Sequence, residues 1–353
     1  LNYLQVVSMA ALFPMQWPKE IENFFAVQSA ISSASQALLS PDCELSWMSP
    51  AEAFYRKQVG FAVLPFTIVL CCTLVWRAAR VTKCKCRWTI QNVGLEGGPA
   101  QQAPIPVHGG AGGGLPPASF YENRAVLSWV VLLYLFYPTA VKQALAMLAC
   151  ERVGDNYWLS ADLQEPCLEG RHTMLLVLLC VPQLLLHVVG LPLGAFVVLF
   201  RNRKRLFKED VQFRWGLLYA GYRHDVFWWE LTIVIRKVAL VVVGGVFGSR
   251  LGPDMQVYMA LAMMMIFIIV HLAVRPFDEI TPAHRVLHWL ELGALMVCWG
   301  TLYCGMLFWI GNRLPSGFRV FVSFCIVGGN TLFTLLIVVV YARSSVRESR
   351  KHG

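Results

Sequence analysis

The sequence predicts an all-α protein, a polytopic transmembrane helix bundle of about seven spans. Hydrophobic residues make up 57% of the 353 residues and charged residues only 14%, whereas soluble domains contain about 25% charged residues. The apolar residues gather in separate runs of about 20 residues, the length that crosses the hydrocarbon core of a bilayer. Clusters of Lys and Arg follow several of these runs, as is typical of cytoplasmic connections in membrane proteins.

The order of apolar and polar stretches defines five regions. Residues 1–58 are predicted to be an extracellular or interfacial segment, because the apolar run 1–13 is too short to span and prolines follow it. Residues 59–81 form the first span, and residues 82–124 form a disordered cytoplasmic linker rich in Gly and Pro. Six further spans lie within 125–342, at about 125–148, 173–200, 227–247, 255–274, 286–310 and 318–341, before a basic tail at 343–353.

The distribution of basic residues predicts the orientation of the bundle. With the C-terminus in the cytoplasm and the N-terminal side outside, most Lys and Arg residues fall in cytoplasmic connections. The densest cluster joins the third and fourth spans, and anionic lipid of the inner leaflet is its expected partner; it contains Arg201, Arg203, Lys204, Arg205 and Lys208. A topology signal alone would explain the same cluster.

Cysteines appear on both predicted sides of the membrane. Cys150 and Cys167 bound one short acidic loop between adjacent spans, and this orientation places the loop outside, where a disulfide can persist. Cys84 and Cys86 lie in the basic stretch after the first span, where juxtamembrane cysteines can be palmitoylated. Ordinary free thiols are the alternative for that second pair.

The predicted span 227–247 is unusual because it carries Glu230, Arg236 and Lys237. A charge at the bilayer centre costs about 2.5–3.5 kcal/mol on insertion scales. One hypothesis turns these residues toward the protein interior, where they face a polar pathway or gate; the other starts the helix at the interface, with Arg236 and Lys237 snorkelling to water. The topology brings His288 and Glu291 of the sixth span to a similar depth, so the five residues form a predicted intramembrane cluster. Within it we expect Glu291 to face Arg236 or Lys237.

Several stretches together resemble a known family: LNYLQVVSMAALFPMQWP, SPDC, LFYPT, YWLSADLQEPC, LYAGYRHDVFWWELTIVIRK and HLAVRPFDEITPAHRVLHWLEL. They resemble the C-terminal membrane domain of the TRP-like (transient receptor potential-like) proteins, large surface proteins of algae and other protists. The resemblance implies a cation-channel-related fold and a covalently linked upstream extracellular region. A start at Leu1 without a signal peptide fits the C-terminal part of such a protein.

Two functions fit these features. The first is a channel-related module, mechanosensory or cation-conducting, working as a homo-oligomer or with other membrane subunits. The second is a non-conducting anchor for an extracellular filament, a ciliary appendage or an adhesion structure, favoured by the lack of a filter-like stretch between the last two spans. A seven-helix receptor is a third possibility, but the sequence shows none of the motifs that such receptors carry at the inner ends of their helices.

We expect no enzyme, cofactor, metal site or nucleic-acid partner, since the sequence shows no catalytic motif. The expected location is the plasma membrane, with the ciliary membrane as a narrower alternative.

Overall fold

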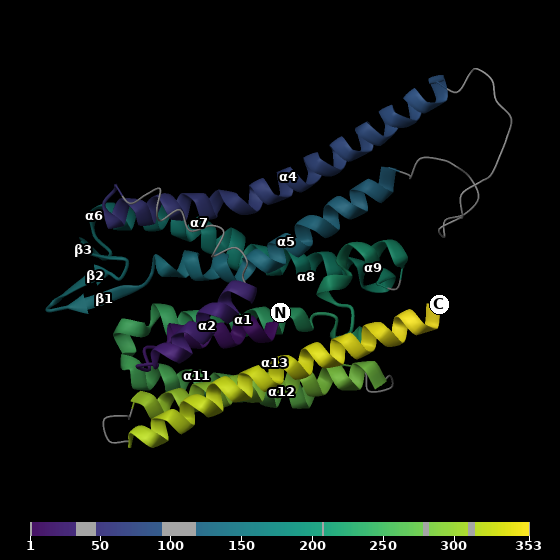
Figure 1. Cartoon of the computed structure of the whole chain (residues 1–353). Helices are drawn as coiled ribbons and strands as arrows, with labels where there is room; N and C mark the ends of the chain where they lie inside the picture. The colour runs from purple at the N-terminus through teal and green to yellow at the C-terminus, as the bar shows by residue number, and fades with distance from the viewer. Residues whose placement is uncertain are drawn as a thin grey trace.

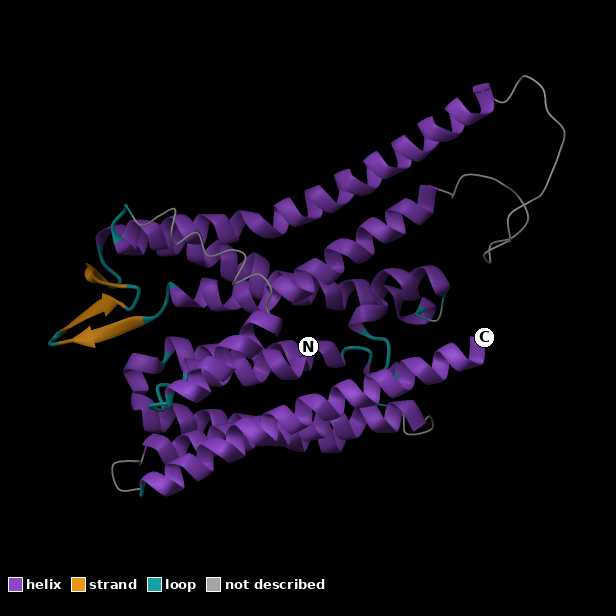
Figure 2. Ribbon diagram, viewed as in Figure 1, coloured by secondary structure: helices purple, strands orange, loops and turns teal. Residues whose placement is uncertain are grey.

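The protein is a bundle of helices with one small sheet at its edge (Figures 1 and 2). The computed structural model describes residues 2–32, 47–93, 118–206, 208–277, 282–309 and 315–352. Within these ranges six helical segments are long and apolar enough to cross a membrane. The predicted fold class, an all-α polytopic bundle, is confirmed.

Six of the predicted spans correspond to these segments. They are formed by α4 (Pro50–Val93), α5 (Ala118–Ala146), a broken helix over Gly170–Arg205, α11 (Gly248–Val274), α12 (Pro282–Trp309) and α13 (Ser316–His352). The predicted span 227–247 is also helical, as α10 (Trp229–Val241) continued by the π-helical turn η7 (Val242–Val246). It does not count among the six, because three charged residues lie within this short stretch.

Helix α10 lies inside the bundle. It packs against α5, α8 (Leu191–Asn202) and α11. Helix α4, by contrast, lies along the edge of the bundle (Figure 1). Apolar side chains of α4 such as Val63, Phe66 and Leu70 are at least half exposed, as suits a surface that meets lipid tails. A charged helix is tolerated in this fold because its charged side chains are turned toward the other helices, while Ile235 on another face is 52% exposed.

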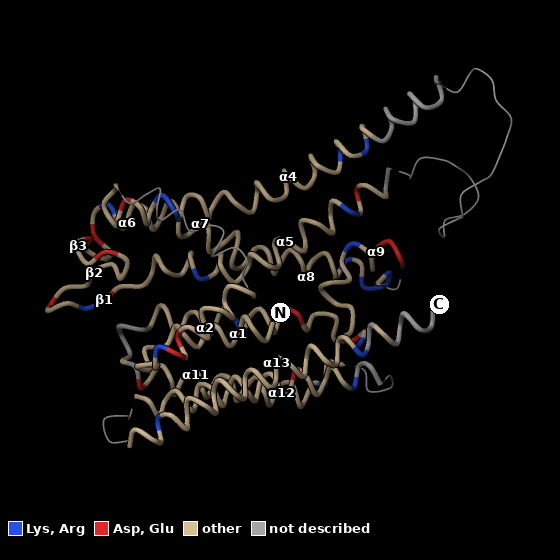
Figure 3. Tube along the Cα trace, in the orientation of Figure 1, with Lys and Arg blue, Asp and Glu red and all other residues tan. Residues whose placement is uncertain are grey.

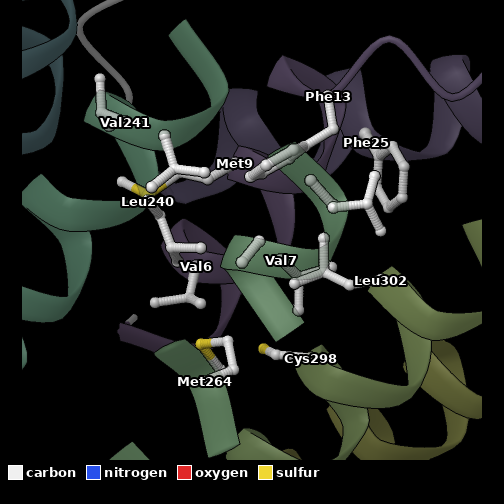
Figure 4. Packing of buried hydrophobic residues seen from close by; sticks show 14 of the residues in the cluster. Val6, Val7, Met9, Phe13, Phe25, Leu240, Val241, Met264, Cys298 and Leu302 are labelled. Carbon is white, nitrogen blue, oxygen red and sulfur yellow. The ribbon is translucent and has the colours of Figure 1, made fainter. Parts of the chain in front are cut away.

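The N-terminal segment is part of the bundle core. It forms α1 (Asn2–Ser8), the 3-10 turn η1 (Met9–Leu12) and, after the prolines, α2 (Lys19–Ser32). Figure 4 shows Val6 and Val7 among Leu240, Met264 and Cys298, which belong to α10, α11 and α12. The beginning of the predicted extracellular or interfacial region therefore lies among the helices. The run is too short to span a membrane and is buried instead by packing against α10, α11 and α12.

The third predicted span is a helix broken in two places. Its parts are α6 (Gly170–Leu175), the π-helical η2 (Leu176–Cys180), α7 (Val181–Gln183), the π-helical η3 (Leu184–Gly190) and α8. A π-helical stretch precedes each of the two prolines, Pro182 and Pro192. Proline lacks the N–H of the α-helical ladder, and the wider π turn absorbs the mismatch.

Helices extend into both ends of the predicted linker 82–124. Helix α4 continues to Val93 and α5 begins at Ala118. The helical backbone therefore extends beyond the apolar part of each span. Residues 94–117, which carry the Gly/Pro run, lie outside the described residues. The side chains of Cys84 and Cys86 also lie outside what the structure describes, and the proposed palmitoylation stays a prediction.

The loop between the second and third spans is a three-stranded antiparallel sheet. Its strands are β1 (Cys150–Val153), β2 (Asn156–Leu159) and β3 (Asp162–Pro166), in the order β1-β2-β3. Gly154, with φ of 66°, occupies the turn between β1 and β2, where a left-handed residue is needed. Cys150 and Cys167 are joined by a disulfide, with their Cα atoms 6.0 Å apart, as predicted.

The sheet and the basic connection lie at opposite ends of the bundle. The basic cluster falls at the end of α8 and in the 3-10 turn η4 (Arg203–Arg205), followed by α9 (Glu209–Trp215). All five of its side chains are exposed. Figure 3 shows further Lys and Arg residues on α4, α5 and α13 toward this end. The arrangement is compatible with the predicted orientation, and the lipid contact of the cluster stays a prediction.

The disulfide gives a first testable prediction. Replacing both Cys150 and Cys167 by Ser should lower the free energy of unfolding by about 3 kcal/mol, the value for a loop of about 15 residues, because the unfolded chain loses a cross-link. Thermal unfolding in detergent measures the change. Cys71→Ser on α4, an exposed free cysteine, is the control and should unfold like the wild type. Free thiols at 150 and 167 in protein purified without reductant would contradict the pairing.

Candidate functional site

The intramembrane cluster lies around α10, whose charged side chains are buried in the bundle. Glu230, Arg236 and Lys237 are 8%, 5% and 2% exposed, so they face the protein and not lipid or water. This excludes the snorkelling alternative, which requires Arg236 and Lys237 to reach the interface. Glu230 lies in the first turn of α10, where the helix dipole favours a negative charge.

Two tyrosine hydroxyls hold the Glu230 carboxylate. Tyr134 of α5 lies 2.8 Å from one carboxylate oxygen, and Tyr222 donates a hydrogen bond of 2.7 Å to the other. Tyr222 precedes α10 and pairs with Phe277, next to Gly221 with φ of 108°. Burial, and then the Glu230 charge, raises the pKa of Tyr222 well above its ordinary value. Its phenol therefore keeps its proton and acts as a donor to the carboxylate.

The N-terminal helix supplies the partners of Lys237. The ammonium donates hydrogen bonds to Oδ1 of Asn2 at 2.6 Å and to Oε1 of Gln5 at 2.7 Å. It also lies 5.2 Å from the centre of the Tyr134 ring, within the range of a cation–π contact. Asn2 additionally lies 2.8 Å from the Tyr134 hydroxyl. Helix α1 is thereby tied to α10 and α5 by polar contacts as well as by apolar packing.

Arg236 pairs with Glu291 of α12 at 2.9 Å. Their side chains are only 6% and 15% exposed, so water screens the attraction between the two charges less than in a surface ion pair. The predicted contact across two helices is confirmed. Glu230, Arg236, Lys237 and Glu291 together carry two positive and two negative charges, and the bundle interior is locally neutral around α10.

Two histidines stack beside this ion pair. The rings of His271 on α11 and His288 on α12 are 4.8 Å apart and nearly parallel. Trp229 and Phe277 also lie against His271. His288 lies about one turn before Glu291 on α12 and contacts His271, which was not part of the predicted cluster. His187, near the middle of the third span, packs against Phe66 and is remote in sequence from these residues.

A second polar contact ties α1 to the far helix of the bundle. Tyr3 donates a hydrogen bond of 2.8 Å to the side chain of Asn330 on α13, and Asn330 donates one of 3.0 Å to Thr301 on α12. All three residues are buried. Consecutive residues of α1 therefore face two networks, with Asn2 directed to the cluster and Tyr3 to α12 and α13.

Sequence reasoning found the charged members of the site and missed the uncharged ones. Asn2, Gln5, Tyr134 and Tyr222 are neutral, and they come from three segments far apart in the chain. The large number of aromatic residues gives no signal that two particular tyrosines face one carboxylate. Among the described residues, no group of three or more His, Cys, Asp or Glu side chains could hold a metal ion.

Comparisons with known proteins give one partial likeness. The chain is 28% identical over 173 residues to Cysteine repeat modular protein A of Toxoplasma gondii, a match that covers 46% of this chain and 6% of that protein. The chain therefore corresponds to a small part of the length of this relative. No family model matches the chain, and no solved structure matches it.

The ion pair between α10 and α12 gives a second prediction. Arg236→Met or Glu291→Met alone should lower the free energy of unfolding by about 3–5 kcal/mol, because the remaining partner is left buried and uncompensated. The double variant should regain most of this loss, since it removes both charges. Thermal unfolding of the purified protein in detergent measures all three.

An exposed ion pair provides the control for this experiment. Arg223 bonds Asp225 at the surface and lowers the pKa of that carboxyl; both side chains are more than 40% exposed. Asp225→Asn should therefore cost less than about 1 kcal/mol. If Arg236→Met were as mild as this control, the pair would not stabilise the contact of α10 with α12.

Proposed function

We propose that this bundle is a membrane anchor within a larger protein, and that its intramembrane cluster holds the helices together without conducting ions. The observation that carries the proposal is the pairing of the charges. Arg236 has Glu291, Lys237 has Asn2 and Gln5, and Glu230 has two tyrosines. A side chain that lines an ion path leaves polar atoms facing water, whereas these atoms face protein partners.

The partial relative supports the larger setting. Its printed name describes a modular protein with cysteine repeats, of which this chain matches 6%. We propose that the bundle likewise anchors a region outside the present sequence. The disulfide in the β1–β3 sheet supports a location in which that end of the bundle meets an oxidising compartment, and the plasma membrane is the site we propose.

A cation-conducting, TRP-like module is the second candidate. The resemblance of the sequence to TRP-like membrane domains favours it, as does the presence of ionised groups inside the bundle. Conduction would require the pairs around Glu230 and Lys237 to separate and admit water, or several copies to form a path between them. Both candidates agree on the membrane bundle and differ in whether ions cross it.

Ion flux through reconstituted protein decides between the candidates. Potassium-loaded liposomes that contain the purified chain should release no more potassium than loaded liposomes without protein, because the charged groups are held by protein partners. Liposomes treated with gramicidin show the release expected of an open path. A flux that appears with the wild type and falls at least tenfold in Glu230→Gln would overturn the anchor proposal and favour the channel.

Tags at the two ends of the bundle test the orientation and the location. An epitope inserted after Gly154, in the turn between β1 and β2, should be stained by antibody on intact cells. An epitope after Gly353 should be stained only once the membrane is permeabilised. The turn is suitable because a Cβ added at Gly154 meets open space. The reverse staining pattern would overturn the orientation, and staining confined to internal membranes would overturn the plasma-membrane location.

A further inference from the structure

A cavity of about 310 Å³ lies beside the intramembrane cluster, between α5, α8 and α10. This is the lower end of the range for small-molecule sites in proteins. Its walls are mostly apolar and aromatic: Trp129 and Leu133 come from α5, Phe196 and Leu199 from α8, and Val234 from α10. Trp129 also contacts Trp215 edge to face, and Phe196 stacks on Phe227. These flat aromatic surfaces favour an apolar ligand body.

Three residues with polar groups are among those that line this cavity: Tyr134 of α5 and Glu230 and Lys237 of α10. Glu230 and Lys237 have opposite charges, so the lining as a whole favours a neutral ligand. Two of the three ammonium protons are used by Asn2 and Gln5. Each oxygen of Glu230 accepts from one tyrosine, and a carboxylate has about four acceptor positions. The remaining capacity is therefore one ammonium donor and the free acceptor positions of the carboxylate, and a ligand hydroxyl can both accept from the first and donate to the second.

The cavity borders a helix that faces lipid. Helix α8 belongs to a segment able to cross the membrane, and its Leu193 and Phe200 are about half exposed. Gly194 lines the cavity and is itself exposed. The absence of a side chain at this position leaves the cavity open past α8, so a molecule dissolved in the bilayer can reach it without crossing water.

From these observations we infer that the cavity binds a neutral lipid with a hydroxyl group, its apolar body lying among the aromatic residues and its hydroxyl donating to Glu230. A sterol and a diacylglycerol both have this chemistry. A phospholipid with a net negative head is disfavoured, because its charge would unbalance the opposite charges of Glu230 and Lys237 beside the cavity. The inference is independent of whether the bundle anchors or conducts.

Photolabelling of the purified full chain in nanodiscs tests the inference. A diazirine-bearing sterol and a diazirine-bearing diacylglycerol are each used as a probe, and labelled peptides are mapped by mass spectrometry. The expected result is labelling of the α5, α8 and α10 residues around the cavity, reduced at least tenfold by the matching unlabelled lipid. The probe that is competed in this way identifies which of the two lipids the site accepts.

Variants at Gly194 give the matched comparison. A Cβ at this position meets no atom within 4 Å, so Gly194→Leu and Gly194→Phe should fold and fill the cavity in two steps. Labelling should fall with each step, at least tenfold for Gly194→Phe. Gly60→Phe on α4 is the control, because Gly60 is also exposed and open but does not line the cavity; its labelling should match the wild type.

Several results would overturn the inference. Labelling unchanged in Gly194→Leu, whose folding is checked by thermal unfolding, would show that the probes bind elsewhere. The same conclusion follows if labels spread over the exposed apolar surface of α4. Competition by phosphatidic acid stronger than by either neutral lipid would exclude the neutral-hydroxyl chemistry and favour an anionic ligand.

Discussion

The constraint on which the structure depends is the burial of charge on α10. Three ionisable side chains within one helix cost many times the thermal energy when they leave water unpaired. The bundle offsets this cost with partners from four other segments: α1, α5, α12 and the turn before α10. Each of these segments must occupy its place for α10 to be stable, so the electrostatics of one helix fix the arrangement of most of the bundle.

The partners explain why α1 is in the core although it is too short to span a membrane. Apolar contacts of Val6 and Val7 place it between α10, α11 and α12. Its polar residues then serve opposite neighbours, since Asn2 and Gln5 hold Lys237 and Tyr3 holds Asn330. In a low-dielectric interior these hydrogen bonds are stronger than at a surface. Helix α1 thus connects α10 to α13 through hydrogen bonds, whereas α4 lies at the outside of the bundle.

Much of this could be predicted from the sequence because the strongest signals are local. Long apolar runs identify the six spanning segments, and the inward position of Glu291 follows once the order of the spans brings α10 and α12 to one depth. The neutral partners could not be predicted, because an asparagine, a glutamine and two tyrosines gain their roles only from tertiary contacts. The β1–β3 sheet was missed for a related reason: its strands have four or five residues, too few for an alternating pattern to stand out from a polar loop.

The cavity and the cluster meet at the same two residues. Glu230 and Lys237 line the cavity on one side and bind Tyr222, Asn2 and Gln5 on the other. A molecule in the cavity therefore lies next to Lys237, the side chain that binds Asn2 and Gln5 of α1. A neutral ligand leaves the balance of two positive and two negative charges intact, whereas a charged one leaves α10 with a net charge inside the bundle. The electrostatics that determine how the helices pack also determine which molecules can lie beside them.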